Sequence, residues 1–217
     1  MIKKDMDVSL YLVTDRRWLG ERTLWDAVDE AILGGVTVVQ LREKEISSRG
    51  FLELAQKVKA VTDRYGVPLI INDRIDIALA IDADGVHLGP EDLPVPIVRK
   101  LLGEERIIGA SAATLAEARL LQAQGADYLG VGAVFPTETK LNAEKVSIEE
   151  IKGIKAAVGI PVVAIGGISA ENCTGVMATG VDGVAVVTAI VAQPDIGEAA
   201  RRLSSLIRRP ESAQRGL

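Results

Sequence analysis

The chain has 217 residues and a formal net charge of −5; 48% of its residues are hydrophobic and 25% are charged. This apolar content lets the chain bury a core and fold alone, which excludes disorder as the default state. The acidic balance excludes an extended nucleic-acid-binding surface, because such a surface needs clustered Lys and Arg to displace counterions from phosphates.

Short runs rich in Val, Ile and Leu alternate with longer amphipathic stretches along the chain. Near-continuous apolar runs are typical of strands buried on both faces of a parallel sheet, whereas strands with one wet face alternate apolar and polar residues. In chain order, the predicted strands are Leu10–Asp15, Val36–Arg42, Pro68–Asp73, Gly85–Gly89, Arg106–Ser111, Tyr128–Val134, Pro161–Gly167 and Gly183–Thr188.

The stretches between these runs have helical spacing and helical ends. The segment Thr23–Gly35 ends in a Gly-Gly pair, which is a common helix stop. Thr114 is expected to cap a helix over 115–125, and Ser169 one over 170–180. About eight strand–helix units predict an α/β fold, a single (β/α)8 TIM barrel. An open doubly wound sheet gives the same alternation and is the alternative, although no G-x-G-x-x-G follows the first strand.

The chain is expected to be one domain over residues 1–217, with its core at about 8–208 and a flexible tail at 209–217. The first residues, Met1–Leu10, lack the apolar stretch of a secretory signal, and the lone Cys173 cannot form an internal disulfide. No apolar run approaches the ~20 residues that cross a bilayer. We therefore expect a cytoplasmic protein without membrane contact, and the oligomeric state is left open, a homo-oligomer included.

The polar residues that close the apolar runs are the candidate functional residues, because reactive groups of such barrels cluster at the carboxyl ends of the strands. They combine cations, carboxylates, hydroxyls and glycines, which suits phosphates held together with a divalent metal. The only histidine, His87, lies inside an apolar run, and we expect it to pack structurally. The set is Gln40, Arg42, Lys44, Asn72, Asp73, Asp92, Ser111, Thr137, Thr139, Lys140, Gly166, Gly167 and Thr188.

Asp73 and Asp92 are the natural metal pair, because Mg²⁺ prefers hard oxygen ligands and is often held by one or two carboxylates plus substrate phosphates. Two other interpretations are equally open at this point. Asp73 begins a helix-like segment and could serve only as its cap. Asp92 could be a simple loop acid before Pro94.

Arg42 and Lys44 stand two residues apart, so an extended strand end would direct both side chains to one face, where they could converge on a polyphosphate. The alternative is an exposed salt bridge with Glu43 or Glu45, which would add little stability. Two cations beside candidate metal ligands favour the first interpretation.

Two further segments point to phosphate binding. Phe135–Ser147 is longer than most barrel loops, and loops of this kind often serve as lids. The AIGGI segment, Ala164–Ile168, lets backbone amides approach an anion closely, because glycine has no side chain. Together with VVTAI after the eighth strand, it is typical of the phosphate site of these barrels.

Several motifs, taken in order, resemble the thiamine-phosphate synthase family. They are QLREK at Gln40–Lys44, IND at Ile71–Asp73, DGVHLGPED at Asp84–Asp92, VFPTETK at Val134–Lys140, AIGGI at Ala164–Ile168 and VVTAI, with Val187 and Thr188. The match covers nearly the whole chain.

The resemblance implies a role for each motif. Arg42, Lys44, Asn72 and Lys140 would hold the pyrophosphate of an aminopyrimidine substrate, and Asp73 and Asp92 would bind Mg²⁺. The thiazole phosphate would bind to Thr137, Thr139, Gly167, Val187 and Thr188, and Gln40 would contact the pyrimidine. Catalytic roles would fall to Ser111, Lys140, Arg42 and Lys44.

The family reaction is dissociative: pyrophosphate leaves the pyrimidine methylene, and the thiazole nitrogen captures the resulting cation. The motifs depart from the family pattern at three positions: Ala113 stands where histidine is common, Pro90 where glutamine is common, and Thr188 where serine is usual. The alternatives are a related thiazole tautomerase, against which the missing histidine at Ala113 argues, and a non-catalytic barrel that binds thiamine precursors. The latter would need neither metal carboxylates nor pyrophosphate cations.

Overall fold

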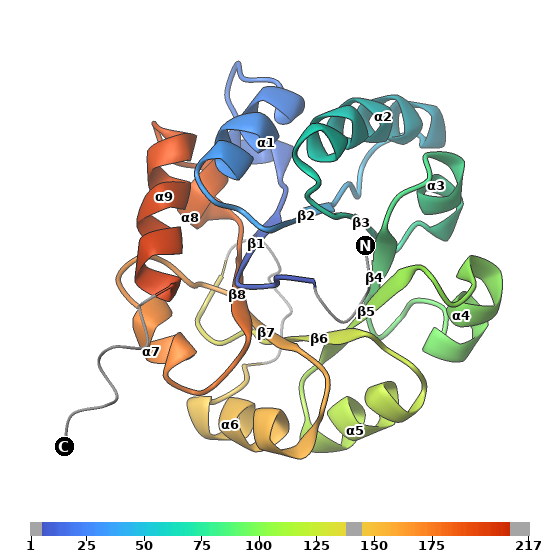
Figure 1. The fold of residues 1–217 in the computed structure, drawn as a ribbon, viewed down its shortest axis with the longest axis vertical. Coiled ribbons are helices and arrows are strands. Elements are labelled where there is room, and N and C mark those ends of the chain that lie inside the picture. Colours follow the sequence, from blue (N-terminus) through green and yellow to red (C-terminus); the bar gives the residue numbers. More distant parts are fainter. Residues whose placement is uncertain (1–5, 138–144, 209–217) are drawn as a thin grey trace.

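The fold is a closed parallel barrel of eight strands surrounded by helices (Figure 1). It is seen in a computed structural model that describes residues 6–137 and 145–208. Each strand pairs with the next in sequence, and the last pairs with the first, so that Leu10 lies opposite Val184. This pairing confirms the predicted TIM barrel and rules out the open sheet. The predicted tail at 209–217 lies outside the described residues.

All eight predicted strands are present. Most end one to three residues earlier than predicted, because the last residues of these runs lie beyond the strand ends. Only the fifth extends further, by one residue. The strands are β1 Leu10–Val13, β2 Val38–Leu41, β3 Leu69–Asn72, β4 Gly85–Leu88, β5 Ile107–Ala112, β6 Tyr128–Val131, β7 Val162–Ile165 and β8 Gly183–Val186.

Helices follow the strands and cover the outside of the barrel (Figure 1). Two short ones, η2 and α8, were not predicted, because single turns leave no periodic signal. The helices are η2 Arg16–Trp18, α1 Leu24–Leu33, α2 Ser48–Tyr65, α3 Ile75–Ala80, α4 Val95–Leu102, α5 Leu115–Ala123, α6 Ile148–Ala157, α7 Cys173–Met177, α8 Thr188–Val191 and α9 Ile196–Ile207.

One of the two predicted caps is confirmed. Thr114 forms a capping box with Glu117 at the start of α5. The prediction for Ser169 is wrong: α7 begins at Cys173, after Asn172, and has no side-chain cap. The Ser169 hydroxyl instead accepts from the nearby Glu171 N–H, so it stabilises the turn that precedes the helix.

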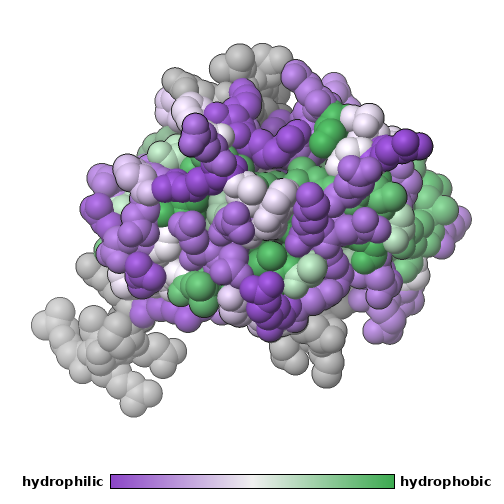
Figure 2. Space-filling view, turned by 90° about the horizontal axis from the view of Figure 1, so that it is seen from above, coloured by the Kyte–Doolittle hydropathy of each residue, from purple (hydrophilic) through white to green (hydrophobic). Residues whose placement is uncertain are grey.

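The core has two layers because both faces of the strands are buried. One layer fills the barrel and includes Tyr11, Ile70 and Tyr128. The other lies between the barrel and the helices and includes Leu10 and Leu12, the neighbours of Tyr11 that point outward. The side of the molecule shown in Figure 2 is mostly hydrophilic, with apolar side chains between the polar ones. Within the described ranges, no helix is both long and apolar enough to cross a bilayer.

Closure of the barrel depends on a glycine at the seam between β8 and β1. A Cβ atom on Gly183 would lie 1.8 Å from the carbonyl oxygen of Val8. We expect Gly183→Ala to lower the free energy of unfolding by about 1–3 kcal/mol, the usual cost of overpacking, because backbone cannot yield as a flexible side chain can. Urea denaturation measures this.

The matched control is Gly153→Ala, on an open position within α6. This change is expected to raise the free energy of unfolding by about 0.5–1 kcal/mol, because alanine favours the helix. Equal unfolding midpoints for the two variants would contradict the packing account of Gly183.

Candidate active site

A cavity of about 710 Å³ opens at the carboxyl ends of the strands. Every candidate residue that the structure describes lines it, which confirms that the strand-end positions converge. Two candidates, Thr139 and Lys140, lie outside the described residues. The lining candidates are Gln40, Arg42, Lys44, Asn72, Asp73, Asp92, Ser111, Thr137, Gly166, Gly167, Val187 and Thr188.

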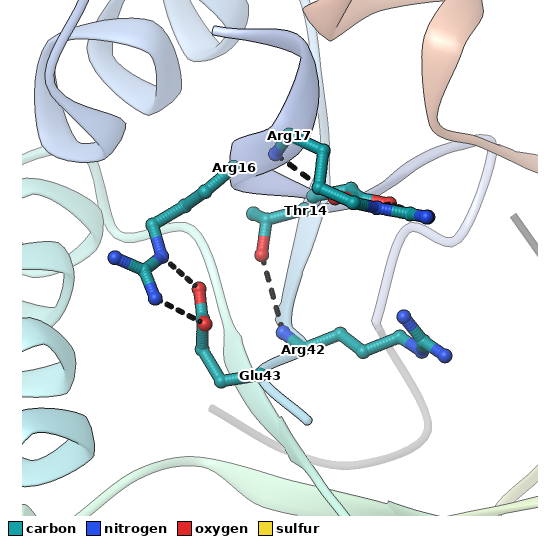
Figure 3. Close-up of polar contacts among 6 residues, drawn as sticks. Thr14, Arg16, Arg17, Arg42 and Glu43 are labelled. Carbon is teal, nitrogen blue, oxygen red and sulfur yellow. Dashed lines mark hydrogen bonds and ion pairs between the residues drawn. The ribbon is translucent and has the colours of Figure 1, made fainter. Parts of the chain in front are cut away.

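The segment after β2 carries Arg42 and Lys44. The loop after β1 holds the backbone of this segment at Arg42 and Glu43 (Figure 3). The Arg42 N–H donates to the Thr14 hydroxyl over 3.1 Å. Glu43 turns away from the cavity and accepts two hydrogen bonds from Arg16, at 2.7 and 2.8 Å. A bidentate pair of this kind fixes orientation as well as position.

These contacts decide against the salt-bridge interpretation of the two cations. Glu43 pairs with Arg16, not with Arg42. No described side chain forms a hydrogen bond or ion pair with the Arg42 guanidinium, which lines the cavity. Lys44 pairs with Asp73, across the mouth of the site. Both cations therefore face the cavity, as the two-residue spacing predicts.

Asp73 follows β3 directly and has a left-handed backbone, with φ of 61°. Such a conformation is uncommon for a residue with a side chain and is concentrated at functional sites. The capping interpretation of Asp73 is wrong: α3 begins after Arg74 and has no side-chain cap. The Asp73 carboxylate instead turns toward Lys44 and Asp92.

Asp92 comes from the loop after β4 and meets Asp73. Its carboxylate accepts a 2.6 Å hydrogen bond from the Gly89 N–H, which closes the loop. Burial and the adjacent Asp73 carboxyl raise the pKa of Asp92 above its ordinary value. The two carboxyl groups are therefore close neighbours on the cavity wall. In the described part of the chain, no group of three or more His, Cys, Asp or Glu side chains is arranged to hold a metal.

The floor of the cavity is a row of hydrogen-bonded side chains that begins at Gln40 and ends at Ser111. The Gln40 amide donates to the Tyr11 hydroxyl over 2.9 Å. The hydroxyls of Tyr11 and Tyr128 are 2.7 Å apart. His87 lies 2.9 Å from Tyr128 through Nδ1 and 2.9 Å from the Ser111 hydroxyl through Nε2.

The prediction that His87 packs structurally is therefore only half right. The ring is partly buried, but it lines the cavity and contacts a predicted site residue. It faces inward because alternate residues of a barrel strand point to the interior.

Tyr11 and Tyr128 also line the cavity but were not predicted. They lie in the middle of apolar runs, so the strand-end criterion passed over them. Glu117, Pro90 and Ala113 complete the rim. The one available signal for Glu117 was its place in the capping box after Thr114.

The opposite side of the cavity is made of backbone and small side chains. Gly166 and Gly167 follow β7 with φ of 103° and 62°. A Cβ atom on Gly167 would lie 2.6 Å from the Pro136 carbonyl oxygen. Beside them, Thr188 begins α8, which has no side-chain cap, so its first amides are not satisfied within the helix.

A family model for thiamine monophosphate synthase matches residues 10–190. The chain belongs to this family. It is accordingly a transferase of thiamine biosynthesis.

Relatives within the family match over nearly their full length. The thiamine-phosphate synthase of Clostridium tetani is 53% identical, over 94% of this chain and 98% of its own. That of Ruminiclostridium cellulolyticum is 54% identical, over 93% and 96%. The solved thiamine phosphate pyrophosphorylase of Pyrococcus furiosus is 40% identical, with a TM-score of 0.87 over 93% and 96% of the two chains. These names agree with the synthase predicted from the motifs.

The glycine side of the site offers a test. Gly167→Ala should cost about 1–2 kcal/mol for its left-handed backbone and about 1–3 kcal/mol more for overpacking. Gly20→Ala is the matched control, because Gly20 has nearly the same φ, 61°, but a Cβ atom there would have no neighbour within 4 Å. If the urea unfolding midpoint falls equally in both variants, the close approach to Pro136 adds nothing to the loss in the free energy of unfolding.

Proposed function

We propose that this thiamine-phosphate synthase joins its two reactants in the cavity at the barrel mouth. One is 4-amino-2-methyl-5-hydroxymethylpyrimidine pyrophosphate, and the other is hydroxyethylthiazole phosphate. The products are thiamine phosphate and pyrophosphate. The observation that carries the proposal is the convergence of two cations, two acids and a glycine-lined backbone on one cavity.

The pyrophosphate binds on the side of β2 and β3. Arg42 offers a planar guanidinium that suits phosphate oxygens, and Lys44 adds a compact positive charge. Asn72, buried at 8% exposure at the end of β3, can donate its amide to the same group. The contacts of Thr14 and Arg16 with this loop hold the two cations ready, so little ordering is needed on binding. Lys140 is proposed for the same role on the family resemblance alone.

Asp73 and Asp92 fit Mg²⁺. The ion prefers hard oxygen ligands and commonly takes one or two carboxylates, with substrate phosphates and waters in the remaining positions. The two carboxyl groups are close neighbours and repel each other when both are ionised, which a cation between them would relieve. Mg²⁺ bound there would place positive charge beside the departing pyrophosphate.

The thiazole phosphate binds on the opposite side, over Gly167 and the start of α8. Glycines let backbone amides approach the phosphate, and the hydroxyls of Thr137 and Thr188 can donate to it. Val187 and Thr139 belong to the same proposed set. Gln40, on the floor, would contact the pyrimidine ring, and Ser111 would contact the reacting region. Both residues line the cavity, which supports these roles.

The proposed mechanism is dissociative. The C–O bond between the pyrimidine methylene and the pyrophosphate breaks with both electrons on oxygen, and the thiazole nitrogen then supplies the pair for the new C–N bond. Arg42 and Lys44 lower the barrier by stabilising negative charge on the leaving group. Apolar walls, including Val163, Ile165 and Ala185, limit the water that could capture the cation.

The direct test is an assay of the purified protein with both substrates and magnesium. Thiamine phosphate and pyrophosphate should form in equal amounts, and neither should form when one substrate is left out. Absence of product at saturating concentrations of both substrates would refute the proposed function.

A second test addresses the metal ligands. Asp73→Asn keeps a side chain that tolerates the left-handed backbone but removes the charge, so turnover should fall at least about a hundredfold while the fold survives. The matched control is Asp76→Asn, which changes an exposed acid paired with Arg74 and should leave turnover unchanged. Circular dichroism checks the fold of both variants. Wild-type turnover in Asp73→Asn across a magnesium titration would remove Asp73 from the metal site.

A further inference from the structure

The row of side chains on the cavity floor contains four consecutive hydrogen bonds. It runs from Gln40 through Tyr11, Tyr128 and His87 to Ser111, at 2.9, 2.7, 2.9 and 2.9 Å. This row, called the hydrogen-bonded chain below, crosses the barrel, because Gln40 is on β2 and Ser111 is on β5. Its two ends are residues to which the proposed function assigns substrate contacts.

The two tyrosines in the middle of this chain are sealed from solvent. Tyr11 and Tyr128 are each 1% exposed. Burial raises the pKa of both phenols above the ordinary value, so both keep their hydrogens. A buried hydroxyl hydrogen without an acceptor is costly, so each of these hydrogens must be used within the chain.

With the Gln40 amide as donor and His87 neutral, this requirement gives the chain of hydrogen bonds a single direction. The Tyr11 oxygen accepts from the Gln40 amide, so the Tyr11 hydrogen goes to its other partner, Tyr128. The Tyr128 hydrogen then goes to Nδ1 of His87. A neutral imidazole that accepts at Nδ1 carries its hydrogen at Nε2, and there it donates to the Ser111 hydroxyl. The Ser111 hydrogen is left to point into the cavity.

The packing around the chain is built to hold this arrangement. A Cβ atom on Gly109 would lie 2.0 Å from the Tyr128 ring, and one on Gly130 would lie 3.0 Å from the His87 ring. Both glycines lie on central strands, where glycine otherwise weakens the sheet. The Tyr128 ring contacts both Tyr11 and His87, with ring centroids 5.8 and 5.6 Å apart.

We propose that Tyr11 and Tyr128 are positioning residues that set the hydrogen-bond polarity of the pyrimidine site through this chain. At one end, Gln40 gives one amide N–H to Tyr11, and its carbonyl oxygen stays available as an acceptor. At the other end, Ser111 is left as a donor. This inference rests on the proposed function, because it deepens the role given there to Gln40 and Ser111.

The polarity matches the chemistry of the pyrimidine reactant. An aminopyrimidine carries an exocyclic amine that donates and ring nitrogens that accept. A floor with a fixed acceptor on one side and a fixed donor on the other distinguishes this ring from one in which an oxo group replaces the amine. A site built to pair with a polar group rejects the analogue that leaves its own groups unpaired.

The direction of the hydrogen bonds can be measured through the tautomer of His87, because His87 is the only histidine of the protein. Protein labelled with ¹⁵N-histidine and purified without a histidine tag should show one imidazole, protonated at Nε2 and not at Nδ1. In Tyr128→Phe, Nδ1 loses its donor, so the Nδ1-protonated tautomer should become populated. Tyr11→Phe breaks the chain one link earlier and serves as the second variant if Tyr128→Phe does not fold.

Kinetics separate positioning from a merely structural role. Tyr128→Phe should lower kcat/KM for the pyrimidine pyrophosphate roughly tenfold, the scale of one hydrogen bond, and leave the KM for the thiazole phosphate within about twofold. If Tyr128 acts through Ser111, then adding Tyr128→Phe to Ser111→Ala should cost less than about twofold more. The control is Tyr65→Phe, which removes a surface hydroxyl bonded to Asp29 and should change neither parameter.

Three results would overturn the proposal: a native His87 protonated at Nδ1, a tautomer unchanged in Tyr128→Phe, or losses in Ser111→Ala and Tyr128→Phe that simply add. Wild-type protein that forms no thiamine phosphate would instead contradict the proposed function. The two failures are distinct, because the spectrum of the unliganded protein reports the polarity of the chain whether or not turnover occurs.

Discussion

The pairing of β8 with β1 is the constraint on which the site depends. It closes eight parallel strands into a ring, so that residues after β2, β3, β4, β7 and β8 face one another across a single opening. The space inside the ring is filled by side chains up to the level of Tyr11 and Tyr128. The loops beyond that level can change in sequence without disturbing the core, and the charged residues of the site lie on these loops.

The site holds groups together that would separate in water. The carboxyl groups of Asp73 and Asp92 are close neighbours, and two cations lie two residues apart at Arg42 and Lys44. The loops keep them in place through bonds that point away from the cavity, such as that between Arg16 and Glu43. The repulsion between like charges is thus offset by the free energy of folding, before any substrate binds. This preorganisation is usual in sites that stabilise developing charge.

Strand positions and strand-end residues could be predicted from the sequence, because both follow from a simple alternation of apolar and polar runs. The candidate acids and cations were predicted in this way, and those that the structure describes all line the cavity. Three features of the structure could not be predicted from the sequence: the conformation of Asp73, the turn at Ser169 and the place of the two tyrosines in the site. The capping interpretation of Asp73 failed because a left-handed residue leaves no periodic trace. Ser169 looked like a helix cap, although the chain makes a turn before α7 begins.

The tyrosines were missed for a different reason. A tyrosine inside an apolar run is indistinguishable from core until its hydroxyl is placed against a partner from a distant strand, and Tyr11 meets Tyr128 across 117 positions of sequence. The roles of individual site residues, including Thr139 and Lys140 outside the described ranges, stay predictions. The oligomeric state and the location in the cell also stay predictions.

The left-handed backbone of Asp73 limits which residues evolution can place there. Glutamate would preserve the negative charge, but its longer side chain is rarely found at positive φ, whereas asparagine accepts this conformation and lacks the charge. Glycine accepts it most readily and offers no ligand at all. Of these residues, aspartate alone combines this backbone with the charge that the proposed metal site requires. A change to glutamate should therefore be tolerated less well here than at Asp76, on the surface of α3.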